Sequence, residues 1–125
     1  MSVDRYKEDL QRTKGIHSQL ETFINDRKNI EAQGNSTSAI DHKLKAEYFK
    51  LTKEVTQLEK LVYEYENPNV TRHSAINGDQ KNKRLKELKP LIESWKKSMT
   101  AAKLIQDKKT MVNAGAKIDM DEELN

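Results

Sequence analysis

Residues 51–68 read LTKEVTQLEKLVYEYENP, and their apolar residues recur at alternating steps of four and three. This spacing places the apolar side chains on one face of an α-helix, which turns once every ~3.6 residues. The pattern stops at Asn67-Pro68, because the residue before a proline is pushed out of helical geometry. The apolar face consists of Leu51, Val55, Leu58, Val62 and Tyr65. A helix with such a face needs a second copy of the chain, another helix of the same chain or a partner to pack against.

Two further segments carry a helical pattern, one on each side of this stretch. The expected helices cover residues of about 3–32, 39–66 and 80–112. Pro90 lies inside the third pattern, and the apolar residues on both sides of it stay in phase, so we expect a kink rather than a new helix start. The expected caps are Gly34 after the first helix, Ser38 with Asp41 at the second, and Asp79 or Asn82 at the third.

The apolar stripes are wider than a two-stranded coiled coil requires. Their flanking apolar residues are Ile16 and Phe23 in the first helix, Phe49 and Leu61 in the second, and Leu91 and Leu104 in the third. Three such helices joined by polar loops close on one another. The sequence therefore predicts an all-α, antiparallel up-down-up three-helix bundle with left-handed coiled-coil-like packing. We expect a monomer in which residues 1–112 form the bundle and residues 113–125 form an acidic flexible tail or linker.

The composition excludes several classes of protein. Charged and hydrophobic residues each make up 34% of the 125 residues, and the apolar ones are periodic, which argues against a disordered chain. There is no cysteine, so disulfides and zinc–thiolate sites are excluded. The chain has neither an apolar run long enough to span a membrane nor a secretion signal. We therefore expect a soluble, cytoplasmic protein.

No set of residues in the sequence predicts catalysis, a cofactor or a metal. The histidines, His17, His42 and His73, lie in separate segments without a carboxylate at a recognisable spacing. His17 falls on the apolar face of the first helix, where a packed, hydrogen-bonded histidine is far commoner than a metal ligand. Metalloprotease, phosphate-loop and calcium-loop motifs are missing. We expect a protein that is not an enzyme.

The basic charge is concentrated in the third expected helix. Residues 80–112 contain ten basic and three acidic side chains, a net charge of +7, whereas residues 1–33 are neutral. Such a segment fits an acidic protein partner, an anionic membrane surface or nucleic acid, and it also fits a solvated helix face. Nucleic acid is the least favoured of these, because nine of the ten basic residues are lysines and the one aromatic residue, Trp95, lies on the apolar stripe.

The second helix ends in LEKLVYEYENPN, and a polar loop leads to the basic segment KNKRLKELKPLIESWKKSM. This arrangement resembles the N-terminal regulatory domain of Golgi and endosomal SNARE proteins, the syntaxins in particular. The resemblance covers about residues 1–112. It implies an up-down-up bundle on the cytoplasmic face of Golgi or endosomal membranes, which binds a tethering-complex subunit or SNARE helices. In the family a SNARE motif and a membrane anchor follow, but no such heptad repeat follows residue 112 here, so we expect either a piece ending in the linker or a different helical protein.

A groove between two helices of such a bundle can receive an amphipathic helix or a short peptide. The candidate partner-binding residues are Tyr6, Leu10, Lys81, Lys83, Arg84, Lys86 and Lys89. Core packing is the simpler explanation for Tyr6 and Leu10. Two alternative functions stay open: a basic helical module that binds nucleic acid or an anionic membrane, and a structural coiled-coil protein.

Overall fold

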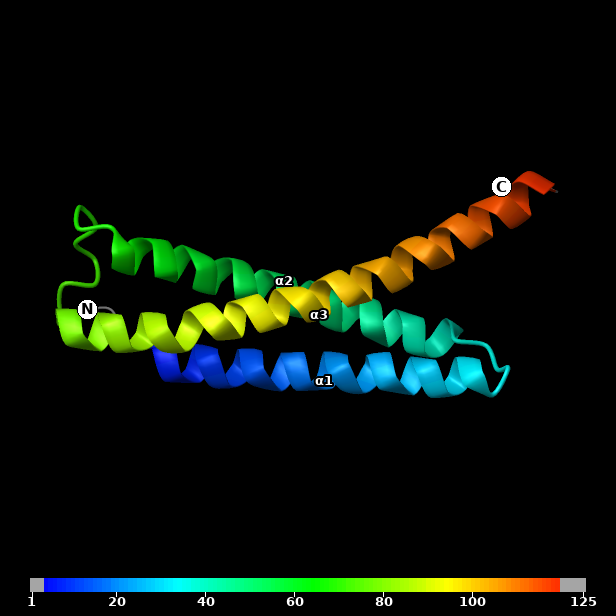
Figure 1. The fold of residues 1–125 in the computed structure, drawn as a ribbon, viewed down its shortest axis with the longest axis horizontal. Coiled ribbons are helices and arrows are strands. Elements are labelled where there is room, and N and C mark those ends of the chain that lie inside the picture. The colour runs from blue at the N-terminus through cyan, green and yellow to red at the C-terminus, as the bar shows by residue number, and fades with distance from the viewer. Residues whose placement is uncertain (1–3, 120–125) are drawn as a thin grey trace.

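The computed structural model describes residues 4–119, with side chains as far as Asp107. It contains three helices, α1 (Tyr6–Ala32), α2 (Ser38–Glu66) and α3 (Gly78–Asp119), joined by a short turn and by a longer loop (Figure 1). The described residues form no strand. The predicted all-α three-helix bundle is confirmed, while the left-handed packing of its helices stays a prediction.

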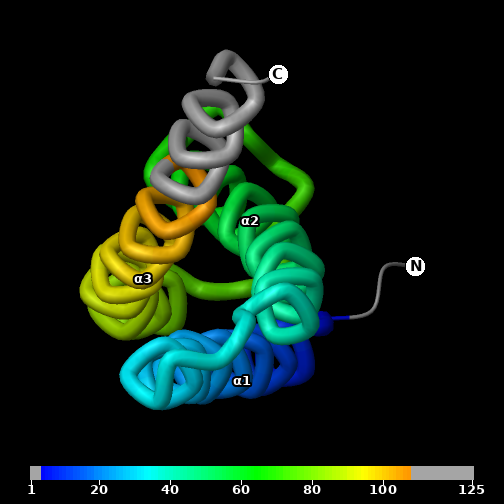
Figure 2. The backbone as a smooth tube through the Cα atoms, turned by 90° about the vertical axis from the view of Figure 1, so that its right-hand side faces the viewer, coloured from blue at the N-terminus to red at the C-terminus, as the bar shows by residue number. Residues whose placement is uncertain are grey.

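Side-chain contacts give the relative direction of the helices. Between α1 and α2 the residue numbers of paired side chains run in opposite directions, and between α1 and α3 they rise together. Helix α1 therefore runs antiparallel to α2 and parallel to α3, and the three lie around a common axis (Figure 2). The pairs are Arg12 with Glu54 and Arg27 with Asp41 between α1 and α2, and Tyr6 with Glu87 and His17 with Ser98 between α1 and α3.

The apolar stripes of all three helices meet in one core. Leu20 of α1, Leu51 of α2 and Leu88 of α3 are fully buried, and Leu58 is 3% exposed. Each fully buried leucine contributes about 1.5–3 kcal/mol relative to an exposed one. The other buried members of the cluster are Tyr6, Leu10, Ile24, Leu44, Val55, Ile92, Trp95 and Ala102.

Two of the residues predicted to widen the stripes lie on the surface instead. Phe49 is 60% exposed and Leu104 is 55% exposed. Each lies two positions from a fully buried residue, Leu51 and Ala102 respectively, and two steps along a helix turn a side chain by about 200°. Their prediction as core residues is therefore wrong. The other four flanking residues, Ile16, Phe23, Leu61 and Leu91, are partly buried against the core.

Gly34 ends α1 as predicted. Its φ of 77° is left-handed, a conformation that glycine adopts without a Cβ clash. The N–H of Asn35 donates to the carbonyl of Ile30 (3.1 Å), and the N–H of Gly34 donates to the carbonyl of Glu31 (2.9 Å). These two bonds satisfy carbonyl groups that the end of a helix otherwise leaves unpaired.

The first residues of α2 and α3 differ from the predicted caps. Ser38 is already helical, and Thr37 precedes it, with its hydroxyl donating to Asp41 Oδ2 (2.8 Å). Asn77 caps α3, because its Oδ1 accepts the backbone N–H of Gln80 (2.8 Å). The predicted caps Asp79 and Asn82 both lie inside α3. Asn, Ser, Thr and Asp all cap helices well, so a polar loop offers several candidates of similar strength.

Helix α3 is longer than predicted. It continues past residue 112 to Asp119, so residues 113–119 of the predicted tail are helical. Residues 120–125 of that tail lie outside the described residues. One glycine in this segment costs only about 1 kcal/mol relative to alanine, and the alanines beside it favour a helix. Pro90 lies within α3 rather than at its start. The helix curves away from α1 towards its C-terminal end (Figure 1).

Candidate partner-binding surface

The two candidate residues on α1 belong to the core. Tyr6 and Leu10 are each 7% exposed and lie in the same cluster as the central leucines. A folded bundle does not present such side chains to a partner. The structure therefore does not support them as contact residues, and core packing accounts for both.

Arg84 of α3 is enclosed by Asp4, by Tyr6 of α1 and by Tyr65 of α2. Its side chain is 11% exposed, and its Cζ lies 4.4 Å from the centroid of the Tyr6 ring. Its Nη2 lies 2.6 Å from Asp4 Oδ2, and its Nη1 donates to the hydroxyl of Tyr65 (2.8 Å). The hydrogen bond from Arg84 holds the pKa of Asp4 below its usual value. Arg84 therefore joins α1, α2 and α3 and is not a free cation.

The hydroxyl of Tyr6 completes this cluster. It donates to Glu87 Oε1 across a distance of 2.5 Å. Burial of the ring and the neighbouring Glu87 carboxylate both raise the pKa of Tyr6 far above its ordinary value. The phenol thus stays protonated and links the first turn of α1 to α3.

The lysines in the first turns of α3 have different surroundings. Lys83 and Lys86 are exposed and Lys81 is half-buried, and none of the three forms an ion pair with a described residue. Lys89 is also exposed, but it pairs with Glu66 at the end of α2. Of the predicted cationic contacts, Lys81, Lys83 and Lys86 are therefore open to a partner, and Lys89 has a competing carboxylate.

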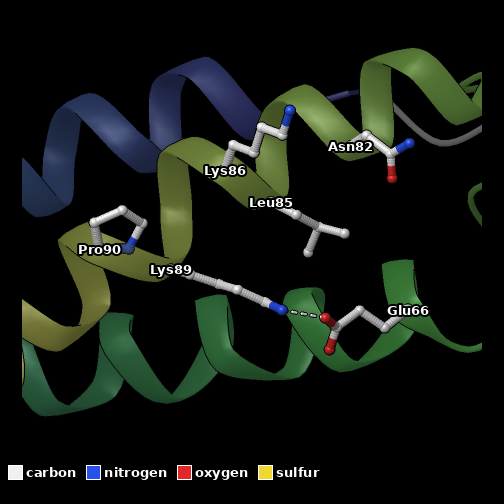
Figure 3. Close-up of a pocket in the computed structure, with 6 residues that line it drawn as sticks. All are labelled: Glu66, Asn82, Leu85, Lys86, Lys89 and Pro90. Atoms are coloured by element: carbon white, nitrogen blue, oxygen red, sulfur yellow. Dashed lines mark hydrogen bonds and ion pairs between the residues drawn. The ribbon is translucent and has the colours of Figure 1, made fainter.

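A groove of about 360 Å³ lies between the end of α2 and the first turns of α3. Leu85 is half-buried and gives this groove an apolar wall. Lys89 reaches across to Glu66, while Lys86 points away from α2 (Figure 3). The lining residues are Glu66, Asn82, Leu85, Lys86, Lys89 and Pro90. An apolar wall with charges of both signs at its rim fits a few side chains of a protein segment.

Two of the histidines form hydrogen bonds. His17 Nε2 lies 2.8 Å from Ser98 Oγ, which in turn donates to Glu21 (2.7 Å). His17 is therefore the packed, hydrogen-bonded residue that its position predicts. His73 Nε2 lies 2.8 Å from Glu64 Oε1, and this contact is the largest cause of the lowered pKa of Glu64. Among the described residues no three His, Cys, Asp or Glu side chains are grouped so that they could hold a metal ion.

The sequence prediction missed one set of surface residues. Tyr63 is 64% exposed and Phe49 is 60% exposed, and Lys53 and Lys60 of the same helix are also exposed. All four occur at helical spacing, so a search for a second stripe on α2 would have found them. The predicted partner-binding residues lie instead on the first helix and in the basic segment of the third helix.

No family model, curated protein or solved structure matches this chain. Within the part of the chain that the structure describes, none of the helices has an apolar stretch of the length needed to cross a lipid bilayer.

Proposed function

We propose that the chain is a non-catalytic protein-interaction module of intracellular vesicle trafficking. Its ligand is a segment of a tethering-complex subunit or a SNARE helix, and its place is the cytoplasmic face of Golgi or endosomal membranes. This proposal combines the resemblance of the sequence to SNARE regulatory domains with a bundle of three helices.

The observation that carries the proposal is the groove between α2 and α3, with the open Lys86 at its rim and the open Lys83 one turn before it on α3. Leu85 supplies apolar surface, and Lys83 and Lys86 are exposed cations without an ion pair among the described residues. An apolar contact adds affinity, and nearby charges select an acidic segment and speed its association. The pair between Lys89 and Glu66 lies across the groove and would have to rearrange when a segment enters.

The open lysines also favour a second candidate, a basic module for an anionic membrane or nucleic acid. Such ligands are recognised largely by charge, so their binding weakens steeply as salt is added. The binding of a protein segment in the groove weakens less when salt is added, because part of its binding free energy comes from apolar contact. The response to salt therefore separates the two candidates.

The test is affinity capture from cell extract at moderate and high salt, with mass-spectrometric identification of what is retained. The baits are the wild-type chain, the variant Lys83→Glu/Lys86→Glu and the control Lys14→Glu/Lys28→Glu. The control changes charge by the same amount at exposed residues of α1 that form no ion pair with described residues. Each bait is first checked for its helical content and thermal unfolding.

We expect tethering-complex subunits or SNARE proteins on the wild-type and control baits at both salt concentrations, and much less on the Lys83→Glu/Lys86→Glu bait. Recovery of nucleic-acid-associated proteins alone, lost at high salt, would reject the trafficking proposal in favour of the basic module. Equal recovery on all three baits would show that the groove is not the binding site.

A further inference from the structure

The outer face of α2 carries a second stripe with its own pattern. Six residues follow one another at steps of four, four, three, four and three, and all six are exposed. Because these steps match the helical repeat, the side chains lie along one line on the side of α2 opposite the core. This outer stripe consists of Lys45, Phe49, Lys53, Thr56, Lys60 and Tyr63.

The carboxylates of α2 form their ion pairs with residues outside this outer stripe. Each of them forms an ion pair with α1, α3, the following loop or a neighbouring lysine. The pairs are Asp41 with Arg27, Glu47 with Lys50, Glu54 with Arg12, Glu59 with Lys96, Glu64 with Arg72, and Glu66 with Lys89. The lysines of the outer stripe form no ion pair with a described residue, and Lys60 alone lies near enough to a carboxylate, Glu64, to help lower its pKa. The stripe therefore carries exposed positive charge.

The two aromatic residues give this charged stripe apolar area. The ring of Phe49 makes an edge-to-face contact with the ring of Tyr48 in the same helix, at 5.9 Å between centroids. The hydroxyl of Tyr63 accepts a hydrogen bond from Asn67 (3.2 Å). Each of the two residues is more than half exposed. Exposed aromatic rings of this size are the side chains that contribute most to protein interfaces.

We propose that the outer stripe of α2 binds an acidic amphipathic helix of a partner protein, with carboxylates facing Lys53 and Lys60 and apolar side chains facing Phe49 and Tyr63. The positive charge of the stripe requires an acidic partner. Lys53 and Lys60 are one heptad apart and Phe49 and Tyr63 two heptads apart, over about 21 Å, which is the spacing at which a second helix lying along α2 makes repeated contact.

This surface is separate from the groove between α2 and α3, and it rests on the proposed function only in taking a protein as the ligand. A helix bound here adds a fourth helix to the outside of the bundle and disturbs no core residue. The pair between Lys89 and Glu66 also stays in place.

The test uses two designed three-heptad helical peptides that differ only in charge. Both carry leucine at the positions facing Phe49 and Tyr63, and one carries glutamate and the other lysine at the positions facing Lys53 and Lys60. Their affinities for the full chain are measured by calorimetry, and the contact surface is mapped by shifts of backbone amide signals. The variants are Lys53→Glu/Lys60→Glu, Phe49→Ser/Tyr63→Ser and the control Lys14→Glu/Lys28→Glu.

We expect the wild-type chain to bind the glutamate peptide at least about tenfold more tightly than the lysine peptide, with shifts along residues 45–63. Lys53→Glu/Lys60→Glu should reverse this preference, because the charges are exchanged on both sides. Phe49→Ser/Tyr63→Ser should lose binding of both peptides, and the control variant should behave as the wild type. All altered residues are exposed, so the fold should persist, and Trp95 reports on the core in each variant.

Binding of the glutamate peptide that survives in Lys53→Glu/Lys60→Glu, or its failure with the wild-type chain, would overturn this inference. A third outcome would also overturn it: the wild-type chain binds vesicles of anionic phospholipid but not the glutamate peptide, and Lys53→Glu/Lys60→Glu no longer binds the vesicles. The groove is intact in Lys53→Glu/Lys60→Glu, so this bait should still capture trafficking proteins from extract. The proposed function would then stand even where the peptide measurements reject the outer stripe.

Discussion

The Tyr6 hydroxyl and the Arg84 guanidinium show how single residues fix the start of the bundle. Arg84 lies on the ring of Tyr6 and bonds to Asp4 and Tyr65, and the Tyr6 hydroxyl donates to Glu87. The Tyr6 hydroxyl and the two terminal nitrogens of Arg84 each have a charged or hydroxyl partner, which offsets the cost of desolvation. An arginine in a basic stretch of sequence is therefore a structural residue in this protein.

Replacing Tyr6 by phenylalanine should change how stability depends on alkaline pH. The raised pKa of Tyr6 means that the folded chain keeps the phenol proton when an unfolded chain loses it. The stability that this proton provides is complete below about pH 10 and is lost as the pH rises above it. Between about pH 9.5 and pH 11, urea unfolding should show that Tyr6→Phe loses less of its free energy of unfolding than the wild type does.

At pH 7 the same variant should lose about 0.5–1.5 kcal/mol, the usual contribution of one hydrogen bond. The two proteins differ only in this hydroxyl group, so the difference between the two curves reports its contribution. If the free energies of unfolding of the two proteins fall in parallel as the pH rises, the buried hydroxyl does not contribute to the loss of stability at alkaline pH.

At the scale of the helices, ion pairs repeat along the contact between α2 and α3. Lys89 pairs with Glu66 and Lys96 pairs with Glu59, so a step of seven residues along α3 corresponds to a step of seven back along α2. The next position on α3 is Lys103, and the next position on α2 is Thr52. Lys103 has no ion pair among the described residues, so the series of pairs ends there.

The variant Thr52→Glu should extend this series and stabilise the bundle. A partly exposed pair with Lys103 should contribute about 0.2–1 kcal/mol relative to Thr52→Gln, which has similar size and helix propensity but no charge. Chemical unfolding in urea at low salt measures the difference. High salt should abolish it, since exposed charges are screened. Equal stabilities of the two variants at low salt would mean that the series of pairs does not continue in register.

The helices themselves were predictable because their stripes are long and regular, and α1 and α2 end as expected at a glycine and before a proline. The ends were less predictable where several polar residues could cap a helix, as at Asn77, or where a single glycine does not stop one, as near the end of α3. Phe49 and Leu104 each lie two positions from a buried residue, which turns their side chains to the surface, and an apolar stripe that is drawn too wide includes them.

The predicted site depended on contacts between segments far apart in the chain, and these are not encoded in local spacing. Arg84 and Lys89 have the same character in the sequence as Lys83 and Lys86. Only the fold brings Asp4 close to Arg84 and Glu66 close to Lys89. Arg84 and Lys89 are therefore not free cations.

At the scale of the whole molecule, one chain encloses its own core with residues from all three helices. Leu58 lies in the second half of α2 and is 3% exposed. Since the apolar stripes are buried inside the bundle, a partner would contact the remaining surface, on which we propose the groove between α2 and α3 and the outer stripe of α2.

Leu58→Ala should therefore cost about 2–5 kcal/mol of the free energy of unfolding, from lost apolar burial and the cavity left behind. The matched control is Leu104→Ala, because Leu104 is 55% exposed and its truncation should change stability by less than about 0.5 kcal/mol. Thermal or urea unfolding measures both. Similar losses for the two variants would contradict the placement of the α2 stripe in the core.

The most direct test of the closed bundle is sedimentation of the wild-type chain over a wide range of protein concentration. If the three helices bury their apolar stripes within one chain, a single species with the mass of one chain should be present throughout. A mass that rises with concentration would show that copies pack against one another. The stripes would then serve assembly, and the chain would be a structural coiled-coil protein rather than an interaction module.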